Sequence, residues 1–236
     1  LRNGKGTDWA LDLLREALPA APEARTPIAE ILARQNRNDE ALDAIVHGFA
    51  ATTNAGTQRA LLGQLIAVKD KVSDKKAGQD TYDRLIASST LSEYDRLALE
   101  LRQVKYEDRP ARLPDLCNRM AACATNAQQR FEALQPLARL YQGAPGRKGE
   151  LLAMIDTIVG SNTPDATIAE QAAGWLRSVG ATNEMHGLLL HVADSTTNEN
   201  DIATARLALA SSGKDIIEDE IDALAARCPS NAAVLA

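Results

Sequence analysis

The sequence predicts an all-α protein, an α-solenoid of about six or seven antiparallel helix pairs. Three observations carry this prediction. Alanine and leucine make up almost a third of the 236 residues, whereas aromatic residues amount to only 3%, a composition that favours helices over a large sheet. Apolar residues recur at helical spacing through most of the chain. Short clusters of turn-forming residues interrupt this spacing at regular intervals.

The turn clusters place the expected pairs along the chain. Clusters such as Asn36-Arg37-Asn38-Asp39 and Ser178-Val179-Gly180 separate the two helices of a pair, and looser connections rich in Asn, Thr and Ser lead to the next pair. We expect a single domain over residues 1–236, cut from a longer chain, because no secretory leader precedes it and its last residues begin an unfinished helix. The pairs are expected near residues 8–25 (second helix only), 26–53, 56–90, 91–125, 127–162, 166–198 and 200–228.

The first helix of each pair carries a small residue where two helices would cross closely. The spacing between successive small residues is 34, 35, 40, 35 and 32 residues. Large apolar residues lie three positions further on, on the same helical face. We expect Trp9, Trp175, Tyr141 and Phe131 to be the large aromatic members of a core otherwise built from aliphatic residues. The small positions are Ala29, Gly63, Ala98, Ala138, Ala173 and Ala205.

A period near 34 residues with two helices per unit resembles the tetratricopeptide repeat (TPR) family. The clearest match is Leu137-Ala138-Arg139-Leu140-Tyr141 with Gly146 in the turn, followed by a helix at Glu150–Ile155. The stretch from Trp9 to Pro22 is similar to a second TPR helix with its terminal proline, and Cys228-Pro229 is similar to a repeat junction. This resemblance implies a right-handed superhelix whose first helices line a concave groove.

The chain also departs from the TPR pattern. Residues 56–125 match in spacing alone, without the family's Pro and Gly marks. Pro110 suits a first helical turn, whereas Pro114 and Pro136 are expected to shorten or kink helices. HEAT and Sel1-like repeats, which are also helical-pair solenoids, therefore remain open as subfamilies.

Charge and cysteine content limit the class of partner and the compartment. The net charge is −6 and the pI is about 5.2, which argues against nucleic acid as the main partner. No run approaches about 20 consecutive apolar residues, so we expect no membrane insertion. The three cysteines, Cys117, Cys123 and Cys228, cannot all pair within one chain. This odd number favours the cytoplasm, while a bacterial periplasm stays open.

No residue pattern points to catalysis, a cofactor or a metal. His186 and His191 are five residues apart and would point about 140° apart on one helix, which does not suit a shared metal ion. The sequence contains no HExxH, CxxC, GxGxxG, phosphate-loop or GxSxG motif, the short patterns that carry such chemistry. We therefore expect a segment that is not an enzyme and that binds neither a cofactor nor a metal.

One set of residues could bind a ligand if the first helices line a groove. In the TPR register, residues just after each small position can face that groove, together with Glu30 and Gln64. A row of guanidinium groups could bind the carboxylates of an extended or helical partner segment, because arginine offers fork-shaped donors. The alternative is ordinary surface arginines, some of them paired with neighbouring carboxylates. The candidate groove residues are Arg34, Arg102, Arg139, Gln142, Arg177 and Arg206.

The leading hypothesis is a scaffold that binds a partner protein or peptide in this groove. A second hypothesis is the helical arm of a multidomain enzyme or of a secretion or assembly protein whose active part lies elsewhere. A third is a helical-repeat RNA binder, which the basic stretch 101–150 favours and the acidic pI opposes. Oligomerisation by stacking of terminal repeats is open as well.

Overall fold

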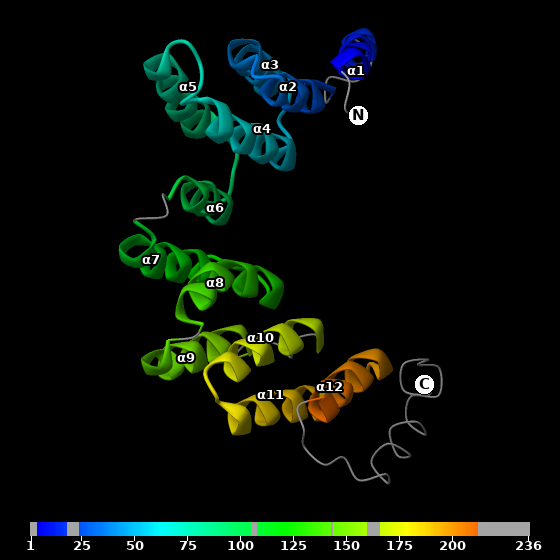
Figure 1. The fold of residues 1–236 in the computed structure, drawn as a ribbon, viewed down its shortest axis with the longest axis vertical. Helices are drawn as coiled ribbons and strands as arrows, with labels where there is room; N and C mark the ends of the chain where they lie inside the picture. Colours follow the sequence, from blue (N-terminus) through cyan, green and yellow to red (C-terminus); the bar gives the residue numbers. More distant parts are fainter. Residues whose placement is uncertain (1–3, 18–23, 105–107, 143, 160–165, 212–236) are drawn as a thin grey trace. The chain divides into compact units, whose positions relative to one another are not determined.

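The computed structural model describes residues 4–17, 24–104, 108–142, 144–159 and 166–211. These residues form twelve α-helices, a 3₁₀ turn and no strand (Figure 1), so the all-α prediction is confirmed. Within these ranges, no helix has both the length and the hydropathy that crossing a bilayer requires. The second helix expected within 200–228, Cys228 and the Pro22 end of the first predicted helix fall outside the described residues.

The chain divides into two compact units at Arg109–Pro110, whereas the repeat spacing predicts a single array. The boundary falls inside the pair predicted at 91–125, at the start of the helix that begins at Arg109. Each unit is therefore described by itself.

The described residues of unit 1 (residues 1–109) form six helices up to Gln103, and these helices pack in an alternating manner. Each of the first four contacts the next helix in sequence, and α2 also contacts α4, α4 contacts α6, and α3 contacts α5. The even-numbered helices α2, α4 and α6 thus pack in succession, and α3 and α5 pack beside them. The helices are α1 (Gly4–Ala17), α2 (Arg25–Arg34), α3 (Asn38–Ala50), α4 (Ala55–Val68), α5 (Lys75–Ser88) and α6 (Glu93–Gln103).

Unit 2 (residues 110–236) shows the same alternation. Helix α10 contacts both of its sequence neighbours, and it also contacts α8 and α12. In the whole described chain the even-numbered helices begin at residues 25, 55, 93, 127, 166 and 199, at intervals of 30 to 39 residues. The helices are α7 (Arg109–Ala122), which begins at the boundary, α8 (Ala127–Tyr141), α9 (Lys148–Val159), α10 (Ala166–Ser178), α11 (Thr182–Ser195) and α12 (Glu199–Ser211).

Polar side chains set where several helices begin. The side chain of Asn54 accepts a hydrogen bond from the backbone N–H of Thr57 at 2.9 Å, and Asn126 accepts one from Gln129 at 2.8 Å. Asp74 starts α5 and Ser92 starts α6 in the same way. Such caps satisfy backbone donors that have no partner inside the helix. The Asn-, Asp- and Ser-containing connections therefore fix the helix starts that the sequence predicts.

Two tight turns, one in each unit, have the same backbone conformation and hydrogen-bond pattern. Asn36, after α2, has φ +60°, and Gly180, after α10, has φ +71°. The next backbone N–H then donates to the carbonyl five residues earlier, from Arg37 to Leu32 and from Ala181 to Leu176, each at 2.9 Å. This is the Schellman pattern of helix ends. It explains why the turns predicted at these two clusters end one helix and start the next within a few residues.

Prolines do not end the helices in which they lie. Helix α7 continues past Pro114 to Ala122, and α8 continues past Pro136 to Tyr141. The expected shortening is therefore wrong. Each proline removes one intrahelical hydrogen bond, and packing against neighbouring helices offsets that loss.

The small positions lie at buried points of the even-numbered helices, with one exception. Ala29, Ala138 and Ala205 are 0% exposed and Ala173 is 2% exposed, and Gly63 is also buried. Ala98 is half-buried, because the residues that α6 buries at this point are its neighbours Leu97 and Leu99.

Two of the four aromatic residues assigned to the core form a stack, and one is on the surface. The rings of Phe131 (α8) and Trp175 (α10) lie 4.9 Å apart and nearly parallel, and both side chains are buried. Tyr141 is half-buried. Trp9 is 68% exposed, so its assignment to the core is wrong: α1 buries Leu11 instead, and Trp9 lies on another face of that helix.

Replacing Ala138 by leucine is expected to destabilise the protein by about 1–3 kcal/mol, because the added atoms overpack a site that is 0% exposed. The free energy of unfolding from denaturant titration measures this. Ala122→Leu, the same change at an exposed position of α7, is the matched control and should shift stability by no more than about 0.5 kcal/mol. Equal stability of the two variants would contradict the proposed small position.

Candidate partner-binding surface

All six predicted groove residues lie on even-numbered helices or at their ends. Arg34, Arg102, Arg139 and Arg177 occupy the last turns of α2, α6, α8 and α10, and Gln142 is the residue that follows α8. A cation in the last turn interacts favourably with the negative end of the helix dipole. This interaction gives the four arginines a local structural role in addition to any binding role.

In unit 1 the two predicted arginines have different surroundings. The guanidinium of Arg34, on a side chain 77% exposed, donates to Glu30 one turn earlier at 2.5 Å. The exposed Arg102 of α6 instead lies over Gly63 of α4, where an added Cβ would come within 2.5 Å of its Nη1 atom. The flexible guanidinium of Arg102 therefore occupies the space beside Gly63, a contact between α4 and α6 that sequence spacing alone does not indicate.

A second contact joins the even-numbered helices of unit 1. The side-chain amide of Gln64, half-buried on α4, donates to the backbone carbonyl of Thr26 on α2 at 3.1 Å. Gln64 was expected to accompany the groove arginines. It serves here as a polar bridge between consecutive even-numbered helices.

In unit 2 one predicted arginine is engaged and two are open. Arg206 of α12 is 23% exposed and donates to Asp194 of α11 at 3.1 Å, which ties these two helices together. Arg139 and Arg177 are exposed, as is Gln142. Arg139 and Arg177 belong to α8 and α10, which pack against each other, so both guanidinium groups are available on adjacent elements.

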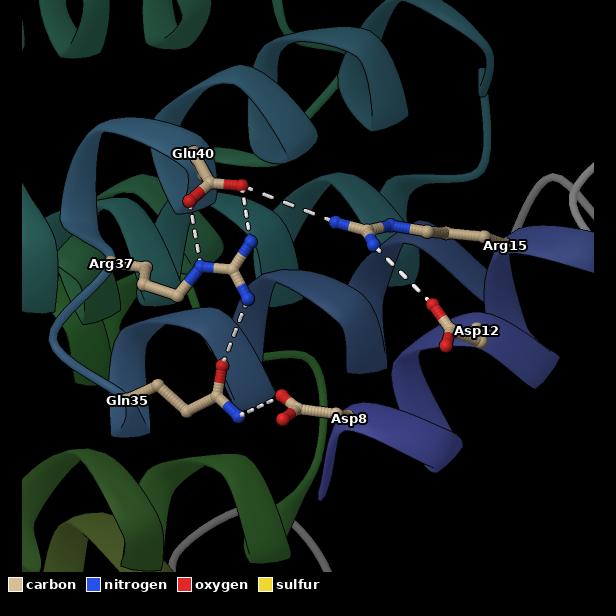
Figure 2. Close-up of polar contacts among 6 residues, drawn as sticks. All are labelled: Asp8, Asp12, Arg15, Gln35, Arg37 and Glu40. Atoms are coloured by element: carbon tan, nitrogen blue, oxygen red, sulfur yellow. Dashed lines mark hydrogen bonds and ion pairs between the residues drawn. The ribbon is translucent and has the colours of Figure 1, made fainter. Parts of the chain in front are cut away.

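A polar network at the start of unit 1 was not foreseen (Figure 2). Arg37, in the α2–α3 turn, donates to both carboxylate oxygens of Glu40 at 2.6 and 2.5 Å and to the side chain of Gln35 at 3.2 Å. Gln35 in turn donates to Asp8 of α1 at 3.3 Å. Arg15 of α1 lies 4.0 Å from Glu40. The network therefore fastens α1 to the α2–α3 turn.

This network changes the pKa values of its central pair. The hydrogen bonds from Arg37 hold the pKa of the Glu40 carboxyl below its usual range, and Glu40 raises the pKa of Arg37. Both groups are in contact with solvent, so the pair is a surface bridge of fork geometry. The Arg-x-x-Glu spacing next to a tight turn is the sequence signal that could have revealed it.

A shallow hollow lies between α7, α8 and α9. Its volume is about 190 Å³, and its walls include Asn118, Tyr141, Glu150 and Met154. Arg147 stands over the Tyr141 ring at 4.9 Å and donates to Glu150 at 2.7 Å. These contacts explain the lowered pKa of Glu150 as an ion pair. The hollow has room for one side chain of a partner.

Within the described ranges, no group of three His, Cys, Asp or Glu residues is arranged to hold a metal ion. Comparison of the chain with protein-family models, curated proteins and solved structures finds no match. The function is therefore inferred from the chain's own residues.

Replacing Arg37 by glutamine is expected to raise the pKa of Glu40 toward its ordinary value, because the main cause of the lowering is removed. Carboxyl ¹³C NMR over a pH titration measures this directly. A carboxylate with a depressed folded-state pKa stabilises the fold above its unfolded-state pKa, and this contribution is lost as pH falls through the folded-state value. The stability difference between wild type and Arg37→Gln should therefore shrink on acidification. Arg34→Gln, in the neighbouring pair, should leave the Glu40 titration unchanged.

The two described cysteines are expected to differ strongly in reactivity. Cys117 is buried, and burial raises the pKa of its thiol to about 11, whereas Cys123 is exposed. At pH 8 only about one in a thousand Cys117 thiols is ionised. In a Cys228→Ser background, a thiol reagent should label Cys123 within minutes and Cys117 only on unfolding. Equal labelling rates in the native protein would contradict the packing of α7 against α8.

Proposed function

We propose that this chain is a non-catalytic, TPR-like protein-interaction module, a right-handed superhelical α-solenoid of helix pairs. The observation that carries the proposal is the alternating contact pattern. In both units, even-numbered helices contact one another as well as their sequence neighbours, as expected when pairs stack. The recurrence of buried small residues on α2, α4, α8, α10 and α12 supports the same architecture.

The electrostatics of the described residues favour a binding role over catalysis. Perturbed pKa values often mark catalytic groups, but here each has a structural cause. Glu40, Glu150 and Glu184 accept hydrogen bonds from basic neighbours at the surface. Burial accounts for the raised pKa values of Tyr82 and Cys117.

The proposed partner is a protein or peptide segment that presents carboxylates. Exposed guanidinium groups lie at the ends of even-numbered helices in each unit, Arg102 in unit 1 and Arg139 and Arg177 in unit 2. Each can bind carboxylates in a bidentate manner. Arg206 already forms an ion pair with Asp194. We therefore expect Arg206 to contribute less to partner binding than Arg102, Arg139 and Arg177.

Changing Arg102, Arg139 and Arg177 together to glutamine is expected to weaken partner binding by about tenfold or more, since each lost charged contact contributes on the order of 1 kcal/mol. The measurement is affinity purification from the cells of origin with tagged protein, followed by quantification of each partner by mass spectrometry and titration of the recovered partner.

The matched control changes three exposed arginines on odd-numbered helices, Arg84 of α5 and Arg112 and Arg119 of α7. This variant has the same net charge as the first. Equal loss of binding in both variants would attribute the effect to overall charge and contradict the proposed surface. Retained binding in the first variant would contradict it as well.

A further inference from the structure

The rest of unit 1 covers only part of the apolar face of helix α1. Leu11 is 1% exposed, and Leu14 is half-buried and packs against the core of unit 1. On the same helix Trp9 is 68% and Leu13 45% exposed. The two exposed residues are four apart, so their side chains are neighbours on the surface. Half of the apolar face is therefore open.

The exposed part of this face, Trp9 and Leu13, is continuous with the buried part and is not surrounded by polar residues on all sides. At about 100° per residue, Ala10 and Ala17 lie between the Trp9–Leu13 pair and the buried Leu11–Leu14 side. Both alanines are half-buried. Trp9 and Leu13 thus extend an existing apolar face, and they form a contiguous apolar surface that a partner can cover.

The opposite border of the open half is acidic. Asp8, Asp12 and Glu16 follow one another at four-residue intervals, which places them in one stripe beside Trp9 and Leu13, and all three are exposed. Arg15, the basic residue of the last turn of α1, pairs with Asp12 of this stripe at 3.6 Å and lies 4.0 Å from Glu40 (Figure 2), so Asp8 and Glu16 are the members of the stripe that Arg15 does not pair with.

Helix α1 is held in place by contacts that leave Trp9 and Leu13 exposed. The buried Leu11 and the network from Asp8 and Arg15 to the α2–α3 turn fix its position. A partner would therefore meet a preformed surface, which lowers the ordering cost of binding.

We propose that the open face of α1, formed by Trp9 and Leu13 and bordered by Asp8, Asp12 and Glu16, binds an amphipathic helix of another protein whose apolar stripe is bordered by Lys or Arg. Complementary charge selects this occupant. Antiparallel pairing of two copies of α1 would set acidic stripe against acidic stripe, which opposes a second copy. The surface shares no residue with the arginines of the even-numbered helices, so its test is independent of theirs.

Tryptophan fluorescence gives a direct test, because the chain has two tryptophans and Trp175 is buried. In a Trp175→Phe background the emission reports on Trp9 alone. The probe is a synthetic tryptophan-free helical peptide with a leucine stripe bordered by lysines. We expect a blue shift of Trp9 emission on titration, and no shift with a matched peptide in which glutamate replaces lysine.

Substitutions then separate the two components of the surface. Leu13→Ala should weaken peptide binding by about tenfold through lost apolar contact. Asp12→Asn with Glu16→Gln should weaken it several-fold and reduce its salt dependence. Leu140→Ala and Leu207→Ala, at leucines 37% and 39% exposed on other helices, are the controls and should leave affinity unchanged. Circular dichroism checks that every variant keeps its helical content.

Four outcomes would overturn the proposal. These are binding of the glutamate peptide as tight as that of the lysine peptide, no effect of Leu13→Ala, and a concentration-dependent dimer that shields Trp9 without peptide. The fourth is a Trp9 blue shift with anionic lipid vesicles but not with the lysine peptide, which would indicate a membrane surface in place of a helix.

Discussion

The alternating contact between helices is the constraint on which the rest of the structure depends. A helix such as α10 must fit α8, α9, α11 and α12 at once, so it offers little room for large side chains at the crossing points. Ala166, Ala169, Ala172 and Ala173 are all buried on this helix. The high alanine content follows from this geometry, because close approach of several helices needs small residues.

Large residues are accommodated where two helices leave space for them. The stack of Phe131 on Trp175 fills the contact between α8 and α10, and the guanidinium of Arg102 fills the space above Gly63. In both cases the side chain of one even-numbered helix completes the surface of the next one. Contacts between even-numbered helices thus include large side chains as well as small residues.

The sequence predicts the helices better than it predicts the surface. Turn residues with defined backbone requirements, such as Asn36 and Gly180 at positive φ and the capping Asn54 and Asn126, mark the helix ends locally. The ion pair of Arg206 with Asp194 and the position of Arg102 depend on how two helices face each other. Such pairings between elements leave no local pattern. The prediction that Trp9 belongs to the core is wrong for a related reason. Helical spacing shows which residues share a face of a helix, but it does not show whether a neighbouring helix covers that face.

Hydrogen exchange of an Ala173→Leu variant tests the account most directly. Ala173 is buried in α10, and stability in a stacked array is transmitted through neighbouring contacts. The account predicts faster amide exchange in α10 and in the helices that contact it, α8, α9, α11 and α12, with α2 to α5 unchanged. Faster exchange confined to α10, or an equal increase in both units, would contradict it.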